Sequence, residues 1–293
     1  MRYSCIHTHT RFCDGADDIE TCCRRAHEKG LEALGFSSHA PITRKTGIHS
    51  IWNLSDDRLG EYIESVRAAQ KRWEGKLPVY LGLEVDYIHG LMGPADRDFR
   101  DMGLDFIIGG LHYVIPPRGE IFTVDDSAEA VDRGIQEGFG GDPMGMVEAY
   151  WDTMEAMIRA GGFDVLAHPD LVKKNNTVKG GSGNRLFSED DDSYRRKTAA
   201  LAALMAGTGV PAEVNTGGIN RGKIKDCYPS IGFLKQFREQ GVPMVINADA
   251  HRAEDLDGHY EEAHKTLLAA GYTETLLFQG RKNGRAAWKS EKL

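Results

Sequence analysis

Seven short apolar runs recur along the chain, each separated from the next by a stretch long enough to form a helix. The runs are rich in β-branched and aromatic residues, which is typical of strands buried in a parallel sheet. This alternation of strands and helices predicts an α/β fold. The seven predicted strands are Tyr3 to His9, Ala33 to His39, Pro78 to Glu84, Asp105 to His112, Phe163 to His168, Pro211 to Asn215 and Pro243 to Asp249.

The stretches between the runs carry signals for helix starts and stops. Ser55 is a predicted N-cap, and Asp142 followed by Pro143 predicts the start of a second helix. We interpret the large side chains that recur at helical spacing in this second helix as core rather than as a ligand cradle. They are Val147, Tyr150, Trp151 and Met154, and the glycines predicted to end helices are Gly30, Gly161, Gly241 and Gly271.

The composition indicates a globular protein of 293 residues, 41% of them hydrophobic and 27% charged. We find no linker that would divide the chain, so we expect a single domain over residues 1–293 with long loop excursions at 113–142 and 173–194. The second excursion contains the glycine-rich stretch from Lys179 to Gly183. A net charge of -8 argues against a dedicated binder of long nucleic acid, and a small substrate fits better.

Location follows from what the sequence lacks. No apolar run approaches the roughly 20 residues that cross a bilayer, and the amino terminus has no secretory pattern, so we expect neither membrane association nor export by this route. Five cysteines without a Cys-x-x-Cys pair indicate neither a disulfide framework nor a thiolate zinc site. The expected compartment is the reducing cytoplasm, and the oligomeric state stays open.

Residues of metal-ligand type stand mainly where the predicted strands end. In a parallel barrel the carboxyl ends of all strands lie on one face, so residues far apart in sequence meet there. The two imidazoles of His7-Thr8-His9 share one face of a strand and can reach one ion, and Asp249-Ala-His251 repeats this spacing. The nine candidate ligands are His7, His9, Asp14, His39, Glu84, His112, His168, Asp249 and His251.

Each of these signals has an alternative interpretation when it is taken alone. The paired histidines could face solvent, and Asp249 could cap the following helix. Glu84 follows an apolar run and could pair with an arginine, while Asp14 precedes a glycine as in an ordinary turn. Six histidines and three carboxylates aimed at one barrel face together favour a metal centre.

The ordered set of motifs resembles the polymerase and histidinol phosphatase (PHP) family from residue 3 to about residue 251. Within that family the chain is most similar to the histidinol-phosphate phosphatase branch. The resemblance implies a distorted seven-stranded (β/α)7 barrel like a TIM barrel, in agreement with the seven runs. The motifs that carry it are Phe36-Ser-Ser-His-Ala-Pro, Gly82-Leu-Glu-Val-Asp-Tyr, Gly109-Gly-Leu-His-Tyr, Ala167-His-Pro-Asp-Leu-Val-Lys-Lys and Glu213-Val-Asn-Thr-Gly-Gly.

The resemblance further implies three divalent metal ions. Several relatives have a histidine where this chain has Asp14, and a carboxylate there favours a harder ion, so we leave zinc, manganese and iron open. The implied ligand sets are His7, His9, Glu84 and Asp249 for the first ion, Glu84, His112 and His168 for the second, and Asp14, His39 and His251 for the third.

The charge of such a centre favours phosphate esters. Three carboxylates and a bridging hydroxide leave about two of the positive charges of three divalent ions, which matches a phosphate monoester dianion. We therefore predict a phosphomonoester hydrolase that attacks with a metal-bridging hydroxide. The resemblance implies a histidinol-phosphatase of histidine biosynthesis, which converts L-histidinol phosphate to L-histidinol and phosphate.

Three alternatives stay open. One is a PHP phosphoesterase that acts on a nucleotide or on an oligonucleotide end. Another is a barrel that has lost its metals and its activity. The third is a metal hydrolase of carbon–nitrogen bonds, although such sites are often bridged by a modified lysine and no lysine ends a predicted strand here.

Several residues are assigned roles beside the metals. Asp249, close to both hydroxide and substrate, could shuttle a proton to the leaving alkoxide as a catalytic residue, or its metal contact could instead keep it purely ionised. A guanidinium fork fits the edge of a phosphate, so we predict substrate-binding roles for Arg221, which follows the strand-ending Asn215, for Asn215 itself and for Arg185 in the second excursion. Acidic groups of the first excursion could meet a cationic amine or imidazole.

Overall fold

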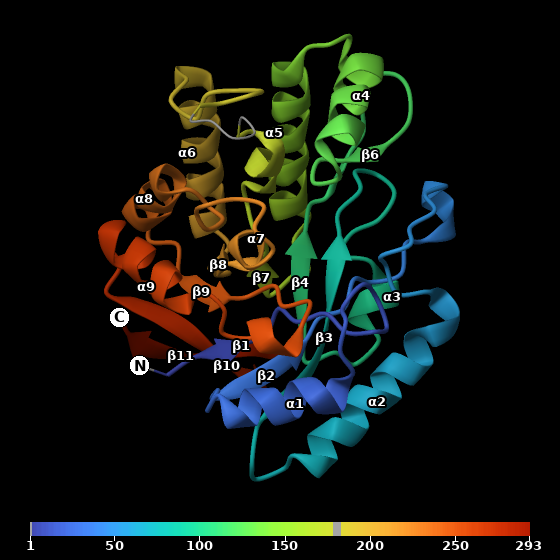
Figure 1. The fold of residues 1–293 in the computed structure, drawn as a ribbon, viewed down its shortest axis with the longest axis vertical. Coiled ribbons are helices and arrows are strands. Elements are labelled where there is room, and N and C mark those ends of the chain that lie inside the picture. The colour runs from blue at the N-terminus through green and yellow to red at the C-terminus, as the bar shows by residue number, and fades with distance from the viewer. Residues whose placement is uncertain (1, 178–182) are drawn as a thin grey trace.

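The computed structural model describes residues 2–177 and 183–293. Within these residues one curled sheet contains nine strands in the order β1-β2-β3-β4-β7-β8-β9-β10-β11 (Figure 1). Neighbouring strands from β1 to β10 are parallel, and β11 runs antiparallel to β10. The strands are β1 (Ser4–Cys5), β2 (Ala33–Phe36), β3 (Val79–Asp86), β4 (Phe106–Gly110), β7 (Val165–Leu166), β8 (Ala212–Asn215), β9 (Met244–Asn247), β10 (Glu274–Lys282) and β11 (Arg285–Lys292).

The α/β class is confirmed, but the predicted count of seven strands is not, because the described sheet has nine. The seven predicted runs correspond to the parallel strands from β1 to β9, whereas the C-terminal hairpin of β10 and β11 was not predicted. In this hairpin β10 mixes buried and exposed positions and β11 has only intermediate and exposed ones, so neither strand forms a long apolar run. Asn283 and Gly284 turn the chain at φ 52° and 75°, as in the tight turns that suit the twist of a hairpin.

The curled sheet brings the continuation of β1 next to the continuation of β9. Thr8 and Ala250 form an isolated parallel bridge, which we call the closing bridge. The His9 N–H donates to the Ala250 carbonyl at 2.8 Å, and the Ala250 N–H donates to the His7 carbonyl at 3.0 Å. The first and last of the predicted ligand pairs are therefore neighbours.

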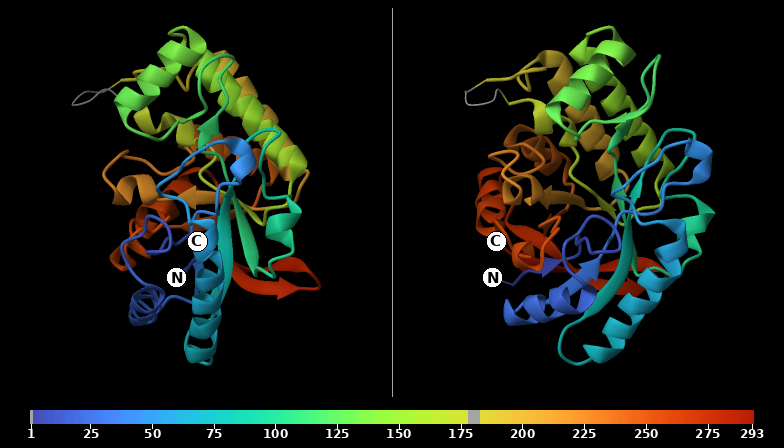
Figure 2. Two further views of the ribbon diagram at one scale, coloured as in Figure 1. Left: turned by 90° about the vertical axis from the view of Figure 1, so that its right-hand side faces the viewer. Right: turned by 45° about the vertical axis from the view of Figure 1, so that its right-hand side comes forward.

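The longer helices cover the outer face of the curled sheet (Figures 1 and 2). A large hydrophobic core lies between these helices and the strands, and a smaller one fills the inner face of the sheet. In the part of the chain that the structure describes, no helix has both the length and the apolar character to cross a membrane. The helices are α1 (Ile19–Glu28), α2 (Leu59–Arg72), α3 (Arg97–Arg100), α4 (Ala128–Phe139), α5 (Pro143–Ala160), α6 (Asp192–Ala206), α7 (Gly217–Asn220), α8 (Ile231–Gln240) and α9 (Tyr260–Ala269).

The predicted helix signals are confirmed in α5. Its N-cap Asp142 accepts a hydrogen bond from the backbone N–H of Met144 at 3.0 Å, and Pro143 occupies the first helical position. Tyr150 and Trp151 are fully buried, so the large side chains of this helix belong to the core. Ser55 precedes a short 3-10 turn that leads into α2, although its side chain makes no capping hydrogen bond.

The two excursions differ in content. Residues 113–142 hold a small hairpin of β5 (Tyr113–Val114) and β6 (Phe122–Thr123), followed by α4, so this excursion is folded rather than irregular. The second excursion begins with a 3-10 helix at Leu171–Asn175. Residues 178–182, which include most of its glycine-rich stretch, lie outside the described residues.

Tight packing inside the sheet gives a first test of the fold. A Cβ at Gly82 would stand 2.5–2.7 Å from ring atoms of Phe106, so we expect Gly82→Ala to lower the free energy of unfolding by about 1–3 kcal/mol. Gly60 in α2 has no atom within 4 Å of such a Cβ, so the control Gly60→Ala should be neutral or slightly stabilising. Urea unfolding of both variants measures the difference. Equal stability of the two variants would contradict the tight packing of Phe106 against Gly82.

Candidate metal centre

The nine predicted ligand residues meet at the carboxyl ends of the parallel strands. Seven of them are buried, Asp14 is exposed and His251 is intermediate. Because the strands are parallel, their ends deliver side chains from the whole length of the chain to one face. His7 and His9 follow β1, Asp14 lies in the next turn, His39 follows β2, Glu84 lies in β3, His112 follows β4, His168 follows β7, and Asp249 and His251 follow β9.

Glu84 lies at the centre of this cluster, with a side chain only 1% exposed. Imidazole nitrogens from the ends of four other strands surround its two carboxylate oxygens at 3.0–3.6 Å. Its Oε2 faces Nε2 of His7 at 3.2 Å, Nε2 of His9 at 3.6 Å and Nδ1 of His39 at 3.0 Å, and its Oε1 faces Nε2 of His168 at 3.0 Å and Nε2 of His112 at 3.6 Å.

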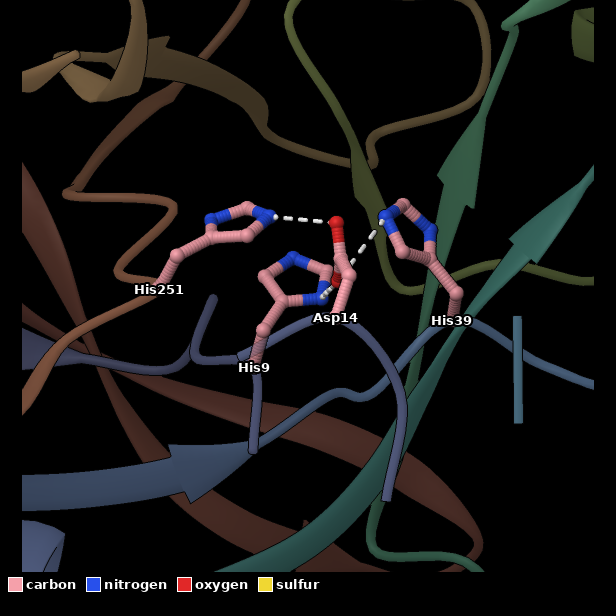
Figure 3. A group of neighbouring side chains, drawn as sticks. All are labelled: His9, Asp14, His39 and His251. Carbon is pink, nitrogen blue, oxygen red and sulfur yellow. Dashed lines mark hydrogen bonds and ion pairs between the residues drawn. The ribbon is translucent and has the colours of Figure 1, made fainter. Parts of the chain in front are cut away.

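A second group forms around Asp14 at the outer side of the cluster (Figure 3). The Asp14 carboxylate lies 3.7 Å from Nδ1 of His9, 3.8 Å from Nε2 of His39 and 3.1 Å from Nε2 of His251. One ligand atom from each of the four residues fits within 4.8 Å of the others. His9 and His39 therefore face both this group and Glu84.

Asp249 connects the cluster to a cation. Its Oδ1 lies 3.1 Å from Nε2 of His9 and 3.7 Å from Nε2 of His7, and its Oδ2 accepts a hydrogen bond from Arg221 at 3.0 Å. The same guanidinium lies within 3.1 Å of the His251 ring nitrogens. Asp249 has φ 48°, an uncommon conformation for a residue other than glycine, so the surrounding structure holds this carboxylate in place.

The donor set fits divalent cations. Four buried atoms that point into the cluster have no hydrogen-bond partner among the described residues: His7 Nε2, His9 Nε2, His39 Nδ1 and Glu84 Oε2. Buried polar atoms are normally hydrogen-bonded, so converging atoms of ligand type without such partners are suited to hold cations. Imidazole nitrogens and carboxylate oxygens are suitable ligands for zinc, manganese and iron.

Local electrostatics favour the metal-binding protonation state of Glu84, Asp249 and His9, whereas at His7, His39 and His112 neighbouring carboxylates outweigh burial and raise the pKa. Burial raises the pKa of Glu84, but the neighbouring histidines, His7 foremost, outweigh burial and hold that pKa well below its usual value. Burial acts in the same direction on Asp249, where Arg221 and His7 lower the pKa well below the usual range. Burial and two adjacent histidines lower the pKa of His9 to about 3. Ionised carboxylates and a neutral imidazole are the forms that coordinate metals.

The predicted substrate-binding residues occupy different places. Arg221 lies against the cluster, whereas the fully buried Asn215 uses its amide within the fold, donating to Glu213 at 2.9 Å and accepting from the Gly217 N–H at 2.8 Å. Within the described ranges, the partners of the Arg185 guanidinium are Asp132 and the Asn175 carbonyl, which lie outside the cluster.

The first excursion supplies little free acid near the cluster. Its acidic pair is Asp125 and Asp126, and Asp125 accepts a hydrogen bond from the ammonium group of Lys174 at 3.1 Å. The neighbouring Asp126 accepts from the backbone N–H of Ser127. These contacts leave the suggestion of a cationic substrate group at this position as a prediction.

Two buried carboxylates beside the cluster were not singled out from the sequence. Glu213 in β8 lies 2.8 Å from Nδ1 of His7, and Asp86 in β3 lies 2.7 Å from Nδ1 of His112. A signal was present, because Asp86 stands two residues after Glu84 and Glu213 two before Asn215, which places each pair on one face of its strand.

Residues 6–217 match the model of the PHP domain, and the chain belongs to this family. The Deinococcus radiodurans protein named "Probable histidinol-phosphatase" is 29% identical over 279 residues, which cover 94% of this chain and 96% of that protein. The Bacillus subtilis protein named "Histidinol-phosphatase" is 24% identical over 267 residues, which cover 87% of this chain and 96% of that protein.

Two solved structures share the fold. A Listeria monocytogenes protein, provisionally named a histidinol phosphatase, superposes with a TM-score of 0.75 at 23% identity, covering 88% of this chain and 98% of its own. The histidinol phosphate phosphatase of Lactococcus lactis, solved with zinc, L-histidinol and phosphate, has a TM-score of 0.68 at 18% identity and covers 98% of this chain and 99% of its own.

Proposed function

We propose that this chain is a metal-dependent phosphomonoester hydrolase that converts L-histidinol phosphate and water to L-histidinol and phosphate, the histidinol-phosphatase reaction of histidine biosynthesis. One observation carries the proposal: within a PHP domain, the buried Glu84 carboxylate faces five imidazole nitrogens at 3.0–3.6 Å. Two relatives named as histidinol-phosphatases match over most of the chain, which supports this substrate.

The cluster would hold three divalent ions, with zinc, manganese and iron as candidates. When bound, such ions neutralise phosphate charge and lower the pKa of a water molecule so that it can attack phosphorus. The proposed ligand sets are His7, His9, Glu84 and Asp249 for the first ion, Glu84, His112 and His168 for the second, and Asp14, His39 and His251 for the third.

Other side chains would bind the substrate and move a proton. Arg221 stands beside Asp249 with a side chain 30% exposed, so its guanidinium can turn from that carboxylate to a phosphate oxygen. Asn215 would order the loop in which Arg221 lies. Arg185 would contact the substrate from the second excursion. Asp249, which is ionised at rest, would take up the proton that the attacking water loses and pass it to the departing alkoxide oxygen, which then leaves as the alcohol.

The architecture serves this reaction. Residues 1–293 would form one PHP domain, in which the seven parallel strands from β1 to β9 make the distorted barrel and the closing bridge joins its edges. The hairpin of β10 and β11 would extend that barrel. All five cysteines are free thiols, which suits the reducing cytoplasm.

A substrate panel tests the proposal. Phosphate release would be measured for protein loaded with manganese or zinc, with histidinol phosphate, mononucleotides and sugar phosphates as substrates. We expect kcat/KM for histidinol phosphate to exceed the others by at least about 100-fold, because a site that hydrogen-bonds polar substrate groups rejects analogues that lack them. A chelator should abolish activity and added metal should restore it.

Each other outcome has a defined meaning. Equal rates across the panel would overturn the assignment to histidine biosynthesis. A preference for nucleotides or oligonucleotide ends would replace it with the alternative phosphoesterase. Full activity in protein shown to contain no metal would overturn the hydrolytic mechanism.

A further inference from the structure

Glu213 is a fully buried carboxylate whose two oxygens are both occupied. Its Oε1 lies 2.8 Å from Nδ1 of His7. Its Oε2 accepts hydrogen bonds from the backbone N–H of His168 at 3.1 Å and from the side-chain amide of Asn215 at 2.9 Å. Burying a charge is costly unless it is well paired, so a carboxylate at this position needs the three donors that surround it.

The contact between Glu213 Oε1 and His7 Nδ1 determines which ring nitrogen of His7 faces the cluster. A carboxylate can only accept a proton, so Glu213 holds a proton on Nδ1, and with a metal ion at Nε2 the ring would be the neutral imidazole protonated at Nδ1. The lone pair of Nε2 then points toward Glu84 at 3.2 Å and Asp249 at 3.7 Å. This Nε2 is one of the buried atoms that have no hydrogen-bond partner among residues 2–177 and 183–293.

Asp86 and His112 repeat the arrangement on the neighbouring side of the cluster. Asp86 is 2% exposed, and its Oδ1 lies 2.7 Å from Nδ1 of His112. The opposite nitrogen of His112 lies 3.6 Å from Oε1 of Glu84. Two imidazoles from different strands are thus held with Nδ1 on a buried carboxylate and Nε2 toward the centre.

We propose that Glu213 and Asp86 are positioning residues for the metal centre, which fix the tautomer and ring orientation of His7 and His112. Glu213 acts on two strands at once, because it also holds the backbone N–H of His168, whose φ of 20° is unusual. Carboxylates that orient metal-binding histidines typically contribute 10–100-fold to metal affinity. The inference rests on the proposed metal site but not on the proposed substrate.

The test compares Glu213→Gln and Asp86→Asn with the control Asp164→Asn. Asp164 lies at the amino end of β7, at the opposite end of the strand from His168, where it accepts a hydrogen bond from the Ile107 N–H at 2.9 Å and pairs with Arg281. Zinc affinity of the metal-free proteins would be measured by competition with a chelator. We expect about 10–100-fold weaker binding in the first two variants and unchanged binding in the control.

A second readout follows the tautomer directly. Nitrogen NMR of the zinc-loaded protein should show His7 protonated at Nδ1, and Glu213→Gln should shift or remove that Nδ1 proton signal, because an amide oxygen is a weaker acceptor than a carboxylate. Asp86→Asn should do the same for His112. If Glu213→Gln does not fold, the result for Asp86→Asn decides whether the buried carboxylates have the positioning role.

The outcomes separate this inference from the proposed reaction. Zinc affinity and Nδ1 proton signals unchanged from the parent protein would overturn the positioning role. If the two variants bind zinc more weakly but the parent protein does not hydrolyse histidinol phosphate, the positioning role stands. Only the proposed substrate is then overturned. Equal loss of affinity in Asp164→Asn would show that lowered stability alone explains the effect, and would also overturn it.

Discussion

Glu84→Ala should abolish turnover, lowering kcat/KM by at least about 1000-fold, and should reduce the metal content of the purified protein. The reason is the central place of this carboxylate, which lies 3.0–3.6 Å from five imidazole nitrogens and is 1% exposed. Its removal takes a shared ligand from two proposed ions and leaves the surrounding imidazoles without a counter-charge. Steady-state kinetics and elemental analysis measure the two effects.

A matched control is available on the surface. Glu155 in α5 pairs with Arg159 one helical turn away and is 40% exposed, so Glu155→Ala should cost about 0.5 kcal/mol of stability at most and leave kinetics and metal content unchanged. Near-normal turnover in Glu84→Ala would refute the bridging role. A loss of activity with full metal content would limit Glu84 to the chemical step.

Asp249→Asn should lower kcat for histidinol phosphate by about 100- to 10000-fold, the range that general acid catalysis contributes. Asparagine keeps the size of the side chain and an oxygen for coordination, but it cannot give up a proton to the alkoxide. A 4-nitrophenyl ester has a leaving group that departs without protonation, so its kcat should fall far less. The ratio of the two losses isolates proton transfer from metal binding.

Asp14→Asn provides the comparison for this ratio. Asp14 is also a carboxylate of the cluster, 3.1 Å from Nε2 of His251, but it has no proposed role in proton transfer. We expect it to slow both esters by a similar factor. If Asp249→Asn also slows both equally, Asp249 is a ligand and not the acid.

Much of the cluster could be predicted because the carboxyl ends of parallel strands lie on one face of the sheet. His7, Glu84 and Asp249 each follow or end an apolar run, and the parallel sheet brings those ends together. Side chains that lie within a strand carry no such mark. Glu213 has the apolar Ala212 and Val214 on either side, and apart from its two-residue spacing from Asn215 its importance shows in its contact with His7, far along the chain.

The same limit applies to the fold. Asn283-Gly284 is a recognised hairpin signal, but the flanking strands lie on the rim of the sheet with many exposed positions, so no apolar run indicated them. Arg185 illustrates a further limit. Its guanidinium fits a phosphate by chemistry alone, whereas its hydrogen bonds to Asp132 and Asn175 depend on tertiary packing.

The closing bridge has a thermodynamic consequence. Thr8 and Ala250 join the continuation of β1, the first strand of the sheet, to the continuation of β9, and the candidate ligands His7, His9, Asp249 and His251 flank them directly. Any cation held by side chains from both strands would bind the closed sheet and not the open one, so its binding free energy adds to the free energy that keeps these two strands together. Metal supply would then set not only how fast the protein works but also how long its amino-terminal strand stays in place.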